Sequence, residues 1–157
     1  MMRTPTQLSP QQLCQELVRD DGWKVLVVCI MLNQTTGTQV RRVFPEFFKR
    51  WPKPDLLGFP QYKNEMTEML RPLGFQNRKT ERIVQMSWDY QVLDIPNHPE
   101  RVEECRGVGK YAADSYKMFV GGYLILNVQD KELKRYVRWA QEVGGGETDH
   151  AGSGGVQ

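Results

Sequence analysis

The segment CRGVGKYAADSY, Cys105 to Tyr116, decides the fold of this chain. Gly107 and Gly109 stand one residue apart and are followed directly by a run that favours a helix. Two glycines so close cost backbone entropy, which indicates a turn that needs the space that side chains would fill. A helix, a tight glycine hairpin and a second helix can bring backbone N–H groups and the positive end of a helix dipole close to a phosphate. Such a contact positions a nucleic acid but does not read its bases.

The residues around this hairpin predict an all-α domain. Apolar residues recur at three- and four-residue steps, most clearly from Val40 to Trp51, and no strand alternation persists. Ser9 and Asn77 are expected to cap helices, Trp88 to point inward, and Pro45 to bend its helix or force an early start. The expected helices span about 10–18, 23–33, 40–51, 62–70, 77–90, 100–104, 110–120 and 133–140.

The chain length and composition fit one globular domain. With 157 residues, 39% hydrophobic and 25% charged, the chain can bury a core, which we assign to residues 1–143 with the hairpin at 105–109. The segment 144–157, GGGETDHAGSGGVQ, is predicted to be a flexible, glycine-rich tail. The net charge is only +2, so any affinity for nucleic acid must come from a local basic face.

The cysteine pattern argues against several kinds of site. Cys14, Cys29 and Cys105 are widely spaced, and the chain has no CxxC motif and only two histidines. A disulfide scaffold, a zinc site and an iron–sulfur cluster are therefore not expected. The apolar run from Val25 to Leu32 is too short to span a bilayer, and the N-terminus lacks a signal pattern. We expect an intracellular monomer without a membrane partner, nuclear in a eukaryote and otherwise cytoplasmic or in the nucleoid.

The hairpin segment resembles the helix–hairpin–helix of the HhH-GPD superfamily of DNA glycosylases. Cys105 and Arg106 stand where that superfamily commonly has Leu and Pro, and its essential aspartate follows the second glycine by about twenty positions. Asp130 follows Gly109 by 21 positions (130 − 109 = 21). CIMLNQTTG at 29–37 and RPLGFQNRKTERIVQMS at 71–87 resemble the catalytic domain of methyl-CpG-binding mismatch thymine and uracil glycosylases, in their plant and fungal versions. The resemblance covers roughly 20–143 and implies two helical lobes with the active-site cleft between them.

The resemblance makes Asp130 the catalytic carboxylate. Cleavage of an N-glycosidic bond builds positive charge on the sugar, which a fixed carboxylate stabilises while it orients the attacking water. The alternative is that Asp130 only caps the last helix, as aspartate does well. Asp114 and Glu132 are rivals, but Asp114 is expected in a buried polar network and Glu132 in solvent.

Tyr111 implies base removal without strand cleavage. Members that also cut the strand carry at this position a lysine that forms a Schiff base, which tyrosine cannot do. Lys110 lies about 100° around the helix and is a poor substitute. Tyr111 would line the base pocket with Leu32 and Lys24, or be a core aromatic. Lys24 could contact a carbonyl oxygen of the pyrimidine or extend to solvent.

Two loops are expected to enter the DNA. The target base must leave the stack, and by resemblance Gln34 fills the gap while Phe75 presses against the opposite strand. Their alternatives are a polar loop residue and a core aromatic, and for Arg78 and Lys79 a solvated helix face. The carbonyl groups of Cys105 and Gly107 could also bind K⁺ or Na⁺. The remaining expected DNA contacts are Thr35, Gly37, Arg78, Lys79, Gly107, Gly109, Lys110 and Lys131.

These features together predict a monofunctional DNA glycosylase without a cofactor. Its partner would be double-stranded DNA in which thymine or uracil is mispaired with guanine. Two alternatives remain: a non-catalytic module that binds mismatched or damaged DNA, and a glycosylase for another base such as adenine.

Overall fold

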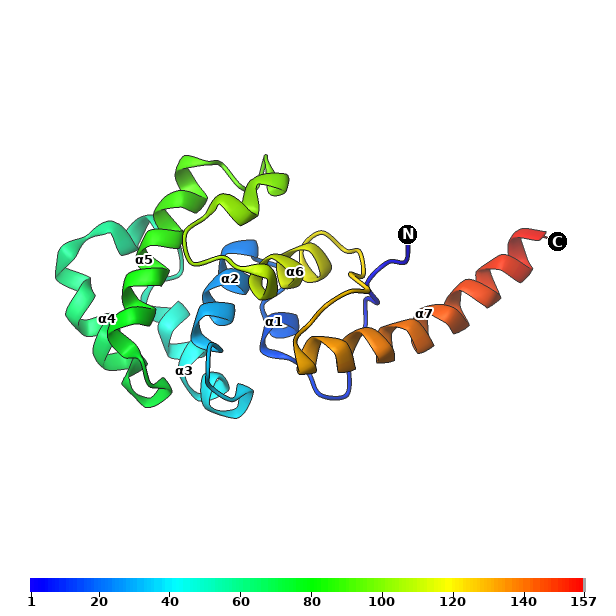
Figure 1. Cartoon of the computed structure of the whole chain (residues 1–157), viewed down its shortest axis with the longest axis horizontal. Helices are drawn as coiled ribbons and strands as arrows, with labels where there is room; N and C mark the ends of the chain where they lie inside the picture. Colours follow the sequence, from blue (N-terminus) through cyan, green and yellow to red (C-terminus); the bar gives the residue numbers. More distant parts are fainter. Residues whose placement is uncertain (157) are drawn as a thin grey trace.

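The computed structural model describes the backbone of residues 1–156 and side chains up to residue 144, and it is helical, as predicted (Figure 1). Its one extended pairing in this range is an isolated antiparallel bridge between Arg3 and Tyr123. The elements are α1 (Cys14–Leu17), α2 (Gly22–Met31), α3 (Gly37–Arg50), η1 (Pro54–Gly58), η2 (Pro60–Tyr62), α4 (Lys63–Leu70), η3 (Arg71–Leu73), α5 (Gln76–Val92), η4 (Pro99–Glu104), α6 (Lys110–Phe119) and α7 (Lys131–Val156), the η elements being short 3₁₀ helices.

Helix α2 lies at the centre of the molecule. Every residue from Val25 to Met31 is buried, which agrees with the unbroken apolar run of this segment. Asp21 caps the helix by accepting a hydrogen bond from the N–H of Lys24. A Cβ atom on Gly22 would stand 2.7 Å from Cε2 of Tyr116, so glycine is required for the close packing of α2 against α6.

The apolar side chains form two clusters, which give the chain its two lobes. The larger cluster is built around α2 to α5, and the smaller one joins the end of α6 to α7 through Phe119, Leu133 and Tyr136. Tyr111 packs against both clusters. In Figure 1, α3, α4 and α5 stand on one side of α2 and α7 on the other. The predicted arrangement of two helical lobes is confirmed.

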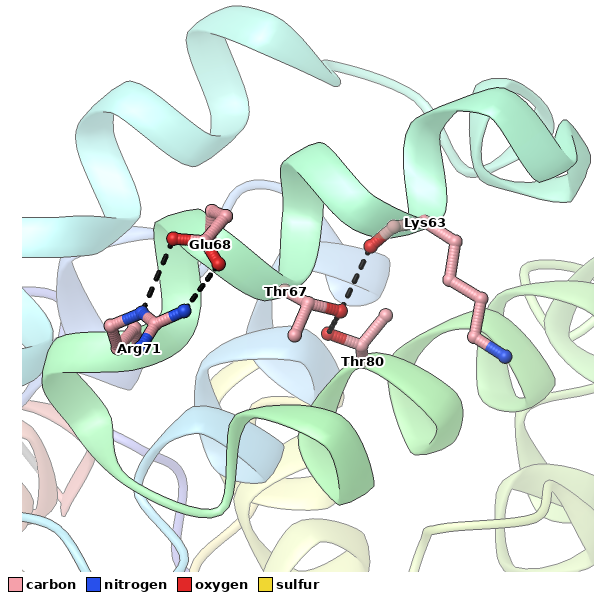
Figure 2. A network of polar contacts seen from close by, with 5 residues as sticks. All are labelled: Lys63, Thr67, Glu68, Arg71 and Thr80. Carbon is pink, nitrogen blue, oxygen red and sulfur yellow. Dashed lines mark hydrogen bonds and ion pairs between the residues drawn. The ribbon is translucent and has the colours of Figure 1, made fainter.

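Hydroxyl groups fasten α4 to α5 (Figure 2). The Oγ1 atom of Thr67 lies 2.9 Å from Oγ1 of Thr80 and 2.8 Å from the carbonyl oxygen of Lys63. Arg71 forms an ion pair with Glu68 at the end of α4, with Nε 3.2 Å from Oε2. These contacts hold the turn from α4 through η3 into α5.

The first helix is shorter than predicted because Glu16 organises the segment before it. This buried carboxylate accepts hydrogen bonds from the N–H and hydroxyl of Ser9, at 2.7 and 2.6 Å, and from the N–H of Leu13, at 2.7 Å. Gln12 has a positive φ of 47°, which a helix does not allow. Ser9 therefore begins a turn, and the helix starts only at Cys14.

Helix α5 differs from its prediction at its start and on one face. It begins at Gln76 after Gly74 and Phe75, both with positive φ, so Asn77 is not its cap. Trp88 is 60% exposed, and the expectation that it points inward is wrong. The buried position belongs to Ser87, whose hydroxyl accepts a hydrogen bond of 2.8 Å from the indole N–H of Trp23. The polar residue Ser87 thus occupies the core position that the periodicity of apolar residues assigns to Trp88.

The remaining elements lie where the sequence places them, apart from the chain end. Helix α3 continues through Pro45. Helix α7 extends to Val156. The side chains beyond residue 144 lie outside the described part of the structure, so the flexibility predicted for 144–157 stays a prediction. Among the described helices, none combines the length and the apolar character needed to cross a bilayer.

Candidate active site

A pocket of about 810 Å³ opens between the hairpin, α2 and the first turn of α7. Its size is within the range of about 300–1,000 Å³ usual for small-molecule sites. It brings together residues from both ends of the sequence, including Gln15 on α1 and Asp130 before α7. The lining residues that the sequence predicts are Leu32, Gln34, Thr35, Gly37, Gly107, Gly109, Lys110, Tyr111 and Asp130.

Asp130 both caps α7 and lines this pocket. Its Oδ2 atom accepts hydrogen bonds from the N–H groups of Glu132 and Leu133, at 2.9 and 3.0 Å. Within the described residues, Oδ1 makes no hydrogen bond, so this half of the carboxylate remains available to the pocket. The cap fixes the side chain beside the positive end of the α7 dipole. The two alternatives for Asp130 are therefore compatible, and Glu132 is exposed, as expected.

Tyr111 and Gln15 form a polar pair at the pocket wall. The amide nitrogen Nε2 of Gln15 lies 2.7 Å from the hydroxyl of Tyr111 and 3.3 Å from Oγ of Ser115. Burial, followed by the nearby Cys29 and Asp130, raises the pKa of Tyr111 well above its ordinary value. The phenol is therefore neutral and keeps its own proton to donate.

Gln15 is a pocket residue that the sequence analysis missed. It is only 1% exposed, although it is polar and lies on a short helix. Its position carries no periodic signal, because the neighbouring Glu16 is also polar and buried. The packing of α1 against α6 brings it to Tyr111, and a single sequence does not reveal that contact.

Cys29 contributes a neutral thiol to the same wall. Burial raises its pKa to about 12, so no thiolate forms near neutral pH. Burial likewise raises the pKa of Cys105 to about 11. In the part of the chain with described side chains, no three His, Cys, Asp or Glu residues cluster as metal ligands. The Cys105 carbonyl accepts the N–H of Val108 at 3.1 Å, and a cation at the hairpin would share that oxygen.

The two hairpin glycines have different surroundings. Gly107 has a φ of 85°, and a Cβ there would lie 3.5 Å from the backbone oxygen and Cβ of Arg82. Gly109 has a negative φ, and a Cβ there would meet nothing within 4 Å. Gly109 is also the N-cap of α6 and offers no side-chain cap, so the first N–H groups of α6 are open to an acceptor.

The hairpin is attached to α5 by Arg106. Its N–H and guanidinium bind the carboxylate of Asp89 at 2.8 to 3.0 Å, and this arginine holds the pKa of Asp89 below its usual value. Arg106, where the superfamily commonly has proline, therefore stabilises the turn in another way.

Three cations stand around the pocket. Lys110 forms an ion pair of 2.8 Å with Oδ2 of Asp114, which is buried, as expected. Arg82 and Arg41, both missed in the sequence, also line the pocket. The guanidinium of Arg41 donates to the carbonyl groups of Gln11 and Gln12.

Gln34 and Phe75 occupy neighbouring exposed loops at the rim. Gln34 is exposed with a φ of 55°, and Phe75 is 54% exposed with a φ of 48°. The exposure of Phe75 is as expected, although the residue lies outside the pocket lining. Both side chains are free to meet another molecule.

Several predicted contacts do not gather at the pocket. Lys24 is half-buried with its ammonium 5.3 Å from the ring centroid of Phe48, outside the pocket lining. Arg78 and Lys131 are exposed but also stand outside it. Lys79 is 1% exposed, so its expectation as a DNA contact or a solvated residue is wrong. A neighbouring loop covers Lys79, which the helical period of α5 cannot show.

The chain matches a known protein family. The family described as HhH-GPD superfamily base excision DNA repair protein matches residues 27–151. The chain is 37% identical over 115 residues to a methyl-CpG-binding domain protein 4-like protein of Arabidopsis thaliana, covering 73% of this chain and 24% of the relative. It is 33% identical over 96 residues to a thymine-DNA glycosylase of Aeropyrum pernix, covering 59% of this chain and 43% of the relative. The chain thus spans less than half the length of these two relatives.

Two solved structures share the fold. A thermostable thymine-DNA glycosylase superposes with a TM-score of 0.61 at 22% identity, covering 70% of this chain and 52% of that one. Endonuclease III trapped as a covalent intermediate with DNA superposes with a TM-score of 0.57 at 20% identity, covering 71% and 54%. At these identities the likeness concerns the fold alone.

Proposed function

Because this chain belongs to the HhH-GPD superfamily of base excision DNA repair proteins, we propose that it is a monofunctional DNA glycosylase for thymine or uracil mispaired with guanine. The observation that carries this proposal is the carboxylate of Asp130, held by the first turn of α7 with one oxygen left to the pocket. Double-stranded DNA would be the partner. The sequence relatives named thymine-DNA or thymine/uracil-DNA glycosylase support the choice of base.

The hairpin and the rim loops would hold the DNA. A phosphate can approach the open backbone at Gly109 and the uncapped N-terminus of α6. Gln34 and Phe75 are both exposed; Gln34 would fill the gap left by an unstacked base and Phe75 would press against the opposite strand. The flipped base then enters the pocket beside Leu32 and Tyr111.

Gln15 is suited to read a pyrimidine. Its Nε2 N–H groups are engaged by Tyr111 and Ser115, which leaves the amide carbonyl to accept a hydrogen bond from the N–H group that thymine and uracil present between two carbonyl oxygens. The bond to Tyr111 fixes the orientation of this amide. Gln15 therefore takes the base-reading role expected of Lys24, whose ammonium is directed to Phe48.

Asp130 would act on the sugar. The N-glycosidic bond breaks with its electron pair on the departing base, and the carboxylate stabilises the positive charge that develops on the sugar. Water then adds to that carbon and gives up a proton to Asp130 or to the base. A carboxylate fixed before the reaction needs no reorganisation when the charge appears.

The proposal of base removal without strand cleavage rests on Tyr111 and Lys110. A Schiff base needs a neutral amine, which the phenol of Tyr111 does not provide. The ammonium of Lys110 is held in an ion pair with the buried carboxylate of Asp114 on the same helix. We propose no cofactor other than a K⁺ or Na⁺ ion bound by the carbonyl groups of Cys105 and Gly107.

The test is base release under single-turnover conditions, with the wild type and Asp130→Asn side by side on G·T, G·U and A·T duplexes and on adenine opposite damaged guanine. We expect release from G·T or G·U alone, and at least about a hundredfold loss in Asp130→Asn. Asparagine keeps the helix cap, so DNA binding should persist.

Each other outcome selects an alternative. Binding in a gel shift without release by the wild type would identify a non-catalytic module, and release of adenine would change the substrate. Reduction with borohydride should trap no covalent complex, and a trapped complex would show that the enzyme also cleaves the strand. Release by neither mismatch would refute the proposal.

A further inference from the structure

A buried ammonium group joins the two rim loops. Nζ of Lys79 lies 2.6 Å from Oγ1 of Thr35 and 3.1 Å from the carbonyl oxygen of Leu73. The Thr35 hydroxyl is itself 2.7 Å from that carbonyl oxygen. We call these three residues the Lys79 network. It connects the loop after α2 to the turn before α5.

Each of these two loops carries an exposed residue in a conformation that L-residues disfavour. Gln34 precedes Thr35 and has a φ of 55°, while Phe75 follows Leu73 by two positions and has a φ of 48°. Such backbone conformations persist only where the surrounding structure imposes them. The network lies directly beside both residues, and the backbone N–H of Lys79 donates to the carbonyl of Phe75 at 2.9 Å.

The choice of lysine at this buried position has no explanation in core packing. Its ammonium is bound by a hydroxyl and a carbonyl, and within the described residues it has no carboxylate partner. A buried charge without a counter-charge is costly, and an apolar side chain of similar length would fill the space at lower cost. What the ammonium of Lys79 adds is directional hydrogen bonding, because this one group can bind both loops at once.

We propose that Lys79 is a positioning residue that holds Gln34 and Phe75 in fixed register, so that both side chains enter the duplex together. The inference rests on the proposed function, since it needs a duplex with an unstacked position. Lys79 itself is buried and touches no DNA. Loss of its ammonium should free the loops from each other without changing the hairpin or the Gln15–Tyr111 pair.

The α4–α5 contact in Figure 2 offers a matched control. Thr67→Val removes the hydroxyl that binds Thr80, the residue next to Lys79. It thus deletes a polar contact of the same helical turn that involves neither Thr35 nor Leu73. A general loosening of α5 should appear in both variants, and a loss of loop register only in Lys79→Met.

The experiment compares binding to two duplexes that differ at one position. One carries a tetrahydrofuran abasic analogue opposite guanine, which a residue can fill, and the other is undamaged. The wild type should prefer the abasic duplex. Lys79→Met should lose at least about tenfold of that preference and keep its affinity for undamaged DNA. Thr67→Val should keep the preference for the abasic duplex, even if Thr67→Val and Lys79→Met lower the thermal unfolding midpoint by the same amount.

A further comparison tests whether Lys79 acts through Gln34 and Phe75. In a chain that already carries Gln34→Ala and Phe75→Ala, adding Lys79→Met should change the preference less than about twofold, because its targets are gone. Thr35→Val, which removes the second member of the network, should reproduce Lys79→Met and serves where that variant folds poorly.

The outcomes separate this inference from the proposed function. Equal preferences in Lys79→Met and Thr67→Val, an additive effect in the double-alanine chain, or no preference in the wild type would overturn the role of Lys79. Because the readout is binding, a protein that releases neither base could still show the dependence on Lys79. In that case the proposed activity would fail while the inference stands.

Discussion

At the scale of the residue, Asp130 shows how one side chain can cap a helix and still present an oxygen to a pocket. Capping uses Oδ2, and the pocket is left with Oδ1. In the sequence, a helix cap and a catalytic carboxylate are alternative interpretations of Asp130, because an aspartate directly before a helix fits both. In the structure, the cap is what gives the carboxylate a fixed direction.

Lys79 makes a prediction at the same scale. Burial lowers its pKa from 10.5 to about 8. Between these values the unfolded chain binds more protons at this residue than the folded one, so its contribution to the free energy of unfolding rises with pH, by at most about 1.4 kcal/mol per unit. Below pH 8 both states are protonated and the contribution is constant.

We therefore expect the stability difference between the wild type and Lys79→Met to move in favour of the wild type from pH 8 to 10.5. Urea denaturation of both proteins across this range measures it. Taking the difference removes the titration of the buried thiols, which both proteins share. A difference that is independent of pH would show that Lys79 is not buried as a charge.

At the scale of the element, the hairpin gives each of its glycines a different task. Gly107 is required by the fold, since its φ of 85° disfavours any other residue. Gly109 has neither a positive φ nor a crowded Cβ position, so folding does not require glycine there. The open backbone at Gly109 is what an approaching phosphate would use.

These two positions make a matched pair of alanine variants. Gly107→Ala should lower the free energy of unfolding by about 1 kcal/mol or more, because alanine disfavours a positive φ. Gly109→Ala should leave stability within about 0.5 kcal/mol of the wild type and weaken DNA binding, because its methyl group stands between the backbone and the phosphate. Thermal unfolding and a binding titration of both variants check this. Wild-type affinity in Gly109→Ala would argue against a phosphate at the hairpin.

At the scale of the whole molecule, charge is arranged locally. The net charge is only +2, yet Arg41, Arg82 and Lys110 line one pocket. Most other arginines with described contacts are engaged in surface ion pairs, such as Arg50 with Glu65 at 2.7 Å. Of the three pocket cations, Lys110 is paired with Asp114 and Arg41 binds backbone carbonyl groups, which makes Arg82 the one to test as a DNA contact.

This arrangement predicts the salt dependence of binding. Each neutralised phosphate adds about 0.9 to the slope of log affinity against log salt concentration. Arg82→Gln should reduce that slope by about 1, whereas Arg50→Gln, which lies in an ion pair, should leave it unchanged. Titrations at several salt concentrations measure both. Equal slopes in the three proteins would place Arg82 outside the interface.

The sequence by itself determined the helical class and the hairpin at 105–109, because turn formation and helical period act between residues close in the chain. The interval from Gly109 to Asp130 gained its meaning from the resemblance to the superfamily. Tertiary structure alone decided that Gln15 meets Tyr111, that Lys79 is buried beneath two loops, and that Lys24 and Trp88 lie outside their predicted places. These contacts join segments far apart in the chain. Helical period shows that a face is polar, but only packing shows which partner satisfies a buried polar group.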